Sequence, residues 1–236
     1  MNEIVSYITI DSVKYVNYKD SNGDIHHVRF GIDDIIDKSN LPPGDIIKKD
    51  DILPKFVNGM KVFNPASTTS SLFYIKKLPL YDVGLSKGYK TTFMDEVRTY
   101  EKMNCLRIRG VPTYHGCIVE DSYISGIVID GYSSRLEDIK NIEVVTIEKI
   151  TRSLRATLAE LHSNNIVHGD INPSNIMLNA KMDPFIIDFD SSGPSMLKRG
   201  SENWMMDSYS KSCNDDIYSL NLVIEYINSK CVVSSN

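Results

Sequence analysis

The sequence predicts an α+β fold of two lobes, in which the second lobe is reduced. Three observations lead to this prediction. Up to about residue 132, short runs rich in β-branched and aromatic residues dominate the chain, with one helical pattern among them. Beyond that point the apolar residues recur three and four positions apart, as on one face of a helix. Of the 236 residues only 20 follow Asp216, which predicts that the second lobe lacks further helices.

The first 51 residues are predicted to form a β-rich extension followed by a connector. Residues 4–18 are rich in β-branched and aromatic side chains, and residues 21–24 indicate a turn into a further strand at residues 25–30. Residues 34–51 are charged and contain Pro42-Pro43-Gly44, a composition typical of a connector. The sequence leaves open whether this extension braces the next lobe or forms a docking surface.

Residues 52–132 are predicted to form the small lobe, which is a sheet with one helix. The strand-like runs are residues 53–57, 60–63, 72–78, 116–120 and 123–129. The first two runs are separated only by Asn58-Gly59, the strongest short signal for a β-hairpin. Apolar side chains spaced three and four residues apart predict a helix over residues 92–103.

Residues 133–236 are predicted to form the reduced large lobe. One helix is expected where apolar residues mark a single face; these residues are Ile147, Ile150, Leu154, Leu158 and Leu161. A last helix is expected from about Asp216 to Ile227. Between the two helices, residues 168–175 are expected to form a loop of polar residues, with short strands beside it at residues 176–178 and 185–187.

Three polar residues in and after that loop have a spacing that points to phosphoryl transfer. In the run His168-Gly169-Asp170-Ile171-Asn172-Pro173-Ser174-Asn175, Asn175 follows Asp170 by five positions. In Ile186-Ile187-Asp188-Phe189-Asp190, Asp188 follows Asp170 by eighteen positions. Phosphoryl transfer from a nucleotide needs an acceptor for the proton of the incoming hydroxyl and oxygen ligands for Mg²⁺. Two aspartates and an asparagine supply these groups.

These residues resemble the catalytic loop and metal-binding segment of the protein kinase-like superfamily, where the pattern is His-Arg-Asp-Leu-Lys-x-x-Asn followed by Asp-Phe-Gly. The resemblance implies that Asp170 is the catalytic base or orients the hydroxyl. It also implies that Asn175 and Asp188 bind the Mg²⁺ that bridges the phosphates of ATP. His168 is expected to hold the loop by packing and hydrogen bonding. Asp216 is expected to hydrogen-bond the backbone of the loop, with a helix N-cap as its alternative role.

The resemblance further implies a lysine on a strand of the small lobe and a glutamate on the helix that follows. Phe73-Tyr74-Ile75-Lys76-Lys77-Leu78 is similar to the Val-Ala-Ile-Lys strand of the family, and Glu96 lies in the next predicted helix. Lys76 would then bind the α- and β-phosphates of ATP, and Glu96 would fix its direction. Lys77 is the alternative, because the sequence does not decide which lysine faces the cleft.

The chain departs from the ordinary protein kinase pattern at several positions. A tight turn stands where a Gly-x-Gly-x-x-Gly loop covers the phosphates, and Tyr74 or Ile75 replaces a small alanine against the adenine. Gly169 replaces the arginine that reads out phosphorylation, and Asn172 replaces a phosphate-contacting lysine. Together with Asp190 in place of the last glycine, these features look closer to atypical and fungal-type kinase-like proteins and to aminoglycoside and choline kinases.

We therefore expect an ATP- and Mg²⁺-dependent phosphotransferase that moves the γ-phosphoryl group to a hydroxyl, as an atypical protein serine/threonine kinase. Two alternatives remain open: a pseudokinase that serves as an interaction or scaffold module, and a small-molecule kinase of the aminoglycoside or choline kinase type. The set of Asp170, Asn175 and Asp188 favours catalysis, whereas the missing glycine loop and Asn172 favour the pseudokinase. The expected partner is a protein substrate or a regulatory protein.

The composition argues against several other classes of protein. A net charge of −5 and a pI near 5.5 oppose a role in nucleic-acid binding. No run approaches the about 18 apolar residues of a membrane span, and the first residues lack the features of a secretory signal. The four cysteines lie far apart, which indicates reduced thiols rather than a zinc site. We expect a cytoplasmic protein, with the nucleus not excluded and the oligomeric state open.

Overall fold

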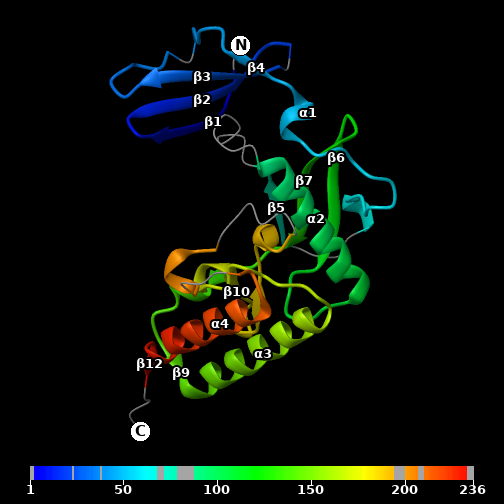
Figure 1. Cartoon of the computed structure of the whole chain (residues 1–236), viewed down its shortest axis with the longest axis vertical. Coiled ribbons are helices and arrows are strands. Elements are labelled where there is room, and N and C mark those ends of the chain that lie inside the picture. Colours follow the sequence, from blue (N-terminus) through cyan, green and yellow to red (C-terminus); the bar gives the residue numbers. More distant parts are fainter. Residues whose placement is uncertain are drawn as a thin grey trace.

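The computed structural model describes residues 3–22, 24–37, 39–67, 72–78, 88–193, 200–206 and 210–232. Within these ranges the chain is α+β, as the sequence predicts (Figure 1). The strands are β1 (Glu3–Ile10), β2 (Val13–Lys19), β3 (Ile25–Gly31), β4 (Asp45–Ile47), β5 (Phe73–Lys77), β6 (Tyr114–Glu120), β7 (Tyr123–Asp130), β8 (Ser134–Arg135), β9 (Ile142–Glu143), β10 (Ile176–Leu178), β11 (Pro184–Ile186) and β12 (Cys231–Val232). The α-helices are α1 (Lys49–Ile52), α2 (Tyr89–Leu106), α3 (Val144–Ser163) and α4 (Cys213–Asn228). The 3₁₀ turns are η1 (Pro65–Ser67), η3 (Leu136–Asp138), η4 (Pro173–Asn175), η5 (Phe189–Ser191) and η6 (Glu202–Trp204).

The N-terminal strands form a sheet of their own, with the order β1-β2-β3-β4 and antiparallel pairing throughout. This sheet lies at one end of the molecule, away from α3 and α4 (Figure 1). The segment expected as a connector, residues 34–51, contributes the edge strand β4 and the short helix α1. The buried Tyr18 of β2 donates its hydroxyl to the Pro42 carbonyl oxygen at 2.9 Å, so the loop before β4 covers part of the sheet.

A second sheet carries the predicted lysine strand. Its order is β5-β7-β6, all antiparallel, and α2 packs beside it (Figure 1). Helix α2 is longer at both ends than the predicted residues 92–103, and its Phe93, Val97 and Tyr100 are buried in the core. Strand β5 is therefore held by hydrogen bonds to β7, and α2 is held by apolar packing.

The predicted hairpin over residues 53–63 is wrong. These residues, all of which lie in the described part of the chain, form only two isolated bridges, from Lys55 to β7 and from Val62 to β6. Their backbone bonds to the second sheet instead, because the Phe63 N–H donates to a carbonyl oxygen of β6 at 2.8 Å. Gly116 permits this close approach: its φ is +131°, and a Cβ there would lie 2.5 Å from the Phe63 nitrogen.

Helices α3 and α4 lie side by side at the other end of the molecule (Figure 1). The apolar face predicted for α3 is buried in the core, as expected. Helix α4 begins at Cys213 rather than near Asp216, because Ser212 and Asp215 form a capping box there. In this box the Asp215 carboxylate accepts the Ser212 N–H at 2.7 Å.

One hydrophobic core extends from the second sheet through α2 to α3 and α4. Strands β10 and β11 lie within one residue of the predicted bounds and pair antiparallel. Strand β10 directly follows the polar loop that carries Asp170, so the pair supports the loop at its C-terminal end. In the ranges that the structure describes, no helix has both the length and the apolar character needed to cross a bilayer.

Candidate functional site

The loop between α3 and β10 is fixed by a buried histidine. The Nδ1 atom of His168 accepts the Asp170 backbone N–H at 3.2 Å, so its Nε2 carries the proton and donates to the Ile187 carbonyl oxygen at 2.9 Å. His168 is fully buried. The side chain thus ties the start of the loop to the end of β11, which is the supporting role expected from the sequence.

Asp216 of α4 holds the backbone of the same loop. Its carboxylate accepts the N–H groups of His168 and Gly169, each at 2.8 Å, and His162 Nε2 lies 2.8 Å away. Asp216 is 1% exposed. A buried carboxylate that accepts two backbone N–H groups fixes the loop to α4, as the sequence predicts, and the N-cap of α4 is Ser212 instead.

Asp170 is oriented by three N–H groups. Its Oδ1 accepts the Asn172 Nδ2 at 3.0 Å and the Ser201 backbone N–H at 2.7 Å, while its Oδ2 accepts the Asn175 Nδ2 at 3.0 Å. Asn172 is itself fixed, because its Oδ1 caps η4 by accepting backbone N–H groups at 3.0 and 3.1 Å. These contacts hold the carboxylate in one direction without neutralising it.

Sequence reasoning did not assign a role to Ser201. The neighbouring Gly200 lies directly against the loop, because a Cβ at this position would be 2.4 Å from the Gly169 carbonyl oxygen. This close packing brings the Ser201 N–H to Asp170 from a segment thirty-one residues further along the chain. Such a contact between distant segments is not readable from local spacing.

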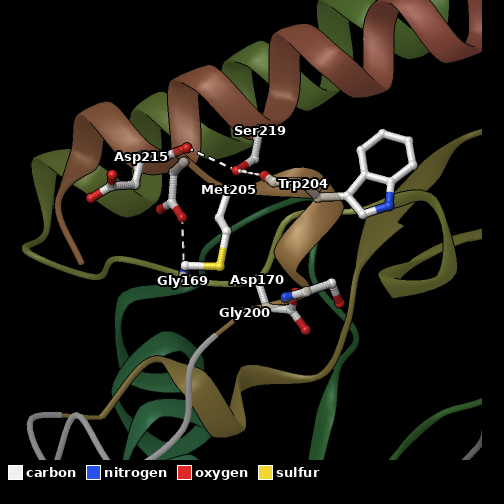
Figure 2. Close-up of a pocket in the computed structure, with 9 residues that line it drawn as sticks. Gly169, Asp170, Gly200, Trp204, Met205, Asp215 and Ser219 are labelled. Atoms are coloured by element: carbon white, nitrogen blue, oxygen red, sulfur yellow. Dashed lines mark hydrogen bonds between the residues drawn. The ribbon is translucent and has the colours of Figure 1, made fainter. Parts of the chain in front are cut away.

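A pocket adjoins Asp170 on the side of α4. Figure 2 shows Met205 and Trp204 between Asp170 and α4. The Ser219 hydroxyl of α4 donates to the Trp204 carbonyl oxygen and so attaches this segment to the helix. The pocket therefore has a wall fixed to α4 and a carboxylate at its edge, and it has no free volume large enough for a water molecule.

The strand lysine that faces the cleft is Lys76. Its Nζ lies 2.8 Å from Glu96 Oε1, 2.5 Å from Asp188 Oδ1 and 3.9 Å from Asp190 Oδ2. Lys77 is the next residue on β5 and points to the opposite face of the sheet. Tyr74 shares the face of Lys76, and Tyr74 is 55% exposed.

The contacts in this cluster shift the pKa values of both Lys76 and Glu96. Burial lowers the pKa of Lys76, but Glu96, Asp188 and Asp190 outweigh it and hold the pKa well above its usual value. Burial raises the pKa of Glu96 to about 7, although Lys76 opposes the shift. Three carboxylates therefore surround the Lys76 ammonium group.

Aromatic rings connect α2 to the loop. Phe189 is fully buried, and its ring centroid lies 5.5 Å from that of Tyr100 and 4.7 Å from that of His168, both in edge-to-face geometry. Tyr100 also stacks on Tyr114 of β6 at 5.8 Å. The rings form a continuous contact from the second sheet to the loop, so Glu96 on α2 and Asp188 beside Phe189 are held in one arrangement.

Asn175 and Asp188 fit a divalent cation. The Ile187 N–H donates to the Asn175 carbonyl oxygen at 2.9 Å, which holds the end of η4 beside the residue that precedes Asp188. The amide nitrogen of Asn175 is directed at Asp170, so its side-chain oxygen is turned the other way. Asp188 has a left-handed backbone, with φ of 67°, a conformation that is enriched at functional sites. Within the described ranges no three His, Cys, Asp or Glu side chains form a metal site alone, so phosphate oxygens would complete the shell, as Mg²⁺ prefers.

The five residues that the sequence singled out for chemistry form two adjoining clusters. Lys76 contacts Glu96 and Asp188, and Asn175 contacts Asp170. The Ile187 N–H donates to the Asn175 carbonyl oxygen at 2.9 Å and joins the two clusters. Lys77, the alternative lysine, is not among them.

Comparison with known proteins agrees with this geometry. Residues 60–229, more than half of the chain, match the family model described as the protein kinase domain. A stretch of 171 residues is 28% identical to mitogen-activated protein kinase kinase kinase A of Dictyostelium discoideum, covering 66% of this chain and 18% of that protein. A stretch of 155 residues is 28% identical to serine/threonine-protein kinase TAO3 of Xenopus laevis, covering 62% of this chain and 17% of that protein. The chain thus spans less than a fifth of the length of these relatives.

Proposed function

Because this chain belongs to the protein kinase domain family, we propose that it transfers the γ-phosphoryl group of ATP to a serine or threonine hydroxyl of a protein. One observation carries the proposal. Lys76 contacts Asp188 at 2.5 Å across the cleft, while Asn175 contacts Asp170 at 3.0 Å. Groups suited to phosphate, to a metal ion and to a hydroxyl proton therefore converge on one place.

Lys76 and Tyr74 form the proposed nucleotide wall. Lys76 binds phosphate oxygens of ATP, and the buried Glu96 holds the lysine in direction through the 2.8 Å contact. Tyr74 lies two residues before Lys76 on the same face of β5, and its exposed ring covers the base by stacking. This aromatic surface compensates in part for the glycine loop that the sequence lacks.

Asn175 and Asp188 would hold Mg²⁺. Both residues offer oxygen atoms, which are the ligands that Mg²⁺ prefers. When bound, the ion would offset negative charge on the phosphoryl group during transfer. Asp188 would then bind the ion in place of part of its contact with Lys76, and the Lys76 ammonium group would be available to bind the phosphates.

Asp170 is the proposed proton acceptor. The hydroxyl oxygen forms a bond to the γ-phosphorus, the bond from this phosphorus to the oxygen of the leaving ADP breaks, and the hydroxyl proton passes to Asp170. The receiving atom is Oδ2, because Oδ1 already accepts two N–H groups whereas Oδ2 accepts one, from Asn175. The fixed direction of the carboxylate orients the hydroxyl for attack.

A protein acceptor is favoured over a small molecule, because the relatives named above are protein kinases. The proposal also keeps the finer expectations from the sequence: an atypical kinase with Gly169 and Asn172 at altered positions, a reduced large lobe, lobe boundaries near 52 and 133, a cytoplasmic location, and no nucleic-acid or membrane partner.

A pseudokinase is the second candidate function. It is favoured by residues 53–63, which contain no Gly-x-Gly-x-x-Gly loop to cover the phosphates and which pair with the second sheet only through two isolated bridges. In that case the cleft would serve a folded interaction module without turnover. The kinase and the pseudokinase differ in one measurable property, which is the Mg²⁺-dependent affinity of the protein for ATP.

Isothermal calorimetry of ATP binding with and without Mg²⁺ tests the nucleotide site. We expect Mg²⁺-dependent binding in the wild type and at least a tenfold loss in Asp188→Ala, because that variant lacks the charged metal ligand. Asp183→Ala is the matched control, since Asp183 forms a surface pair with Lys149 at 2.7 Å, outside the cleft. A folded wild type that does not bind Mg-ATP would favour the pseudokinase.

Asp170→Asn separates turnover from binding. We expect this variant to bind Mg-ATP like the wild type and to lose phosphoryl transfer to protein substrates, because an amide cannot accept the hydroxyl proton. Transfer would be followed with radiolabelled ATP and generic serine- and threonine-containing proteins. Unchanged transfer in Asp170→Asn would remove Asp170 from the chemistry.

A further inference from the structure

Lys211 directs a charged side chain into the protein from the residue just before the N-cap of α4. Its φ is 54°, a left-handed backbone conformation that costs about 1–2 kcal/mol for a residue other than glycine. The capping box of Ser212 and Asp215 starts at the next residue and fixes this strained position. A strained backbone conformation of this kind persists only where surrounding contacts stabilise it.

One such contact is with the segment that follows Asp188. The Lys211 ammonium group donates to the Gly193 carbonyl oxygen. Gly193 in turn lies directly against α2, because a Cβ at this position would be 2.1 Å from Asp95 Cβ and 2.4 Å from Asp95 Oδ2. Lys211, Gly193 and Asp95 therefore form a continuous bridge from the start of α4 to α2.

Charge strengthens the same bridge. Asp95, Asp190 and Asp216 all attract the Lys211 ammonium group, while burial opposes its charge and lowers its pKa. Asp95 is 3% exposed, and its Oδ2 has no hydrogen-bond partner among the described residues. Arg98 reaches only the other oxygen, Oδ1, at 3.6 Å. The charge of Lys211 interacts favourably with this buried carboxylate and offsets part of the cost of its burial.

We propose that Lys211 is a positioning residue that fastens α2 to residues 188–193, so that Glu96 and Asp188 meet at Lys76 before any nucleotide binds. Asp190 links the two lysines, since it lies 3.9 Å from the Lys76 ammonium group and also faces Lys211. The effect of this fastening on catalysis rests on the proposed function, whereas the fastening itself does not.

The consequence concerns regulation. The position before Asp170 is Gly169, which has no side chain with which to bind a modified residue of the segment after Asp188. Lys211 supplies a positive charge to residues 188–193 from the chain itself. Under this proposal the ordering of residues 188–193 does not require a modified side chain.

Amide hydrogen exchange on the nucleotide-free full chain tests the fastening. In Lys211→Met we expect amides of α2 to exchange about tenfold faster than in the wild type, with α3 unchanged, because the loss of a charged hydrogen bond opens α2 locally. Lys211→Arg should restore slow exchange, since it keeps the charge and a donor. Lys149→Met is the control: Lys149 also joins a carbonyl oxygen, that of Lys181 at 2.6 Å, but it does not touch α2.

A folded Lys211→Met protein whose α2 exchanges like the wild type would overturn the proposal. Equal acceleration in α2 and α3 would also overturn it, because that result describes a global loss of stability. If Lys211→Met does not fold, the double variant Lys211→Met with Asp95→Asn replaces the buried charge of Asp95 as well. The same exchange measurement on this double variant then tests whether α2 opens locally.

Steady-state kinetics separates this inference from the proposed function. If the chain is a kinase, Lys211→Met should lower kcat and raise the KM for ATP, and Lys211→Arg should recover both values. If the wild type transfers no phosphate, the proposed function fails, and the exchange experiment still decides whether Lys211 fastens α2.

Discussion

Replacement of Asp216 by alanine should destabilise the protein far more than the same change at its neighbour Asp215. Asp216 is 1% exposed and accepts the N–H groups of His168 and Gly169, both at 2.8 Å. Alanine would leave both N–H groups buried without an acceptor. The fold of the loop that carries Asp170 therefore depends on this one carboxylate.

The magnitude follows from the number of groups left unpaired. Each buried N–H without a partner costs about 1–3 kcal/mol, so two of them cost about 2–6 kcal/mol. The third contact, to His162, adds little, because the side chain of His162 is partly exposed and can bond to water. A domain of this size is stabilised by about 5–15 kcal/mol in total, so Asp216→Ala should remove a large part of it.

Asp215→Ala is the matched control on the same turn of α4. Its carboxylate serves the capping box with Ser212, and loss of such a cap costs about 0.5–2 kcal/mol. Urea unfolding followed by circular dichroism should give a lower midpoint for Asp216→Ala at an unchanged slope. Equal losses for the two variants, or a loss below about 1 kcal/mol for Asp216→Ala, would refute the assignment of the loop anchor.

Three further outcomes are expected. Burial raises the pKa of Glu96 from 4.5 to about 7, so nucleotide binding should strengthen as the pH rises through about 7. The stability of the folded protein should change in the opposite direction: the contribution of a neutral Glu96 is complete below pH 4.5 and lost above about pH 7. Calorimetry and urea unfolding of Glu96→Gln should show neither pH trend, and a pH dependence equal to that of the wild type would contradict this pKa. Lys76→Ala should abolish Mg-ATP binding and Lys77→Ala should leave it intact, and a loss in both would mean that the cleft face is misassigned. Gly110→Ala should lower the Tm strongly, because φ is +73° and the new Cβ would lie 1.9 Å from a side-chain oxygen of α3, whereas Gly59→Ala has open space and should show only the backbone cost of about 1–2 kcal/mol.

The parts of the fold that local patterns control were predicted from the sequence. The apolar face of α3 follows a helical period, and the strands that flank the polar loop follow from apolar runs beside it. The resemblance to the protein kinase-like superfamily rested on a compact motif, and the family match over residues 60–229 confirms it. The roles of Asp170, Asn175 and Asp188 remain predictions that the proposed experiments test.

The hairpin at residues 53–63 shows where local reasoning failed. Asn58-Gly59 favours a tight turn, but a turn signal does not determine which partner the flanking strands choose. Gly116 lets the backbone near Phe63 approach β6, and the hydrogen bonds formed there replace those of a hairpin. Tertiary contact overrode the local preference.

Motif spacing and helical period are properties of neighbouring residues, so they identified the functional groups of the chain and their spacing within each short segment. Which of these groups meet depends on the packing of distant segments. This packing selected Lys76 over Lys77 by a contact with Asp188 across 112 residues of chain, and it brought Ser201 and Lys211 to the site. Such contacts depend on how separate elements pack into one core, and a close approach at one glycine can redirect them.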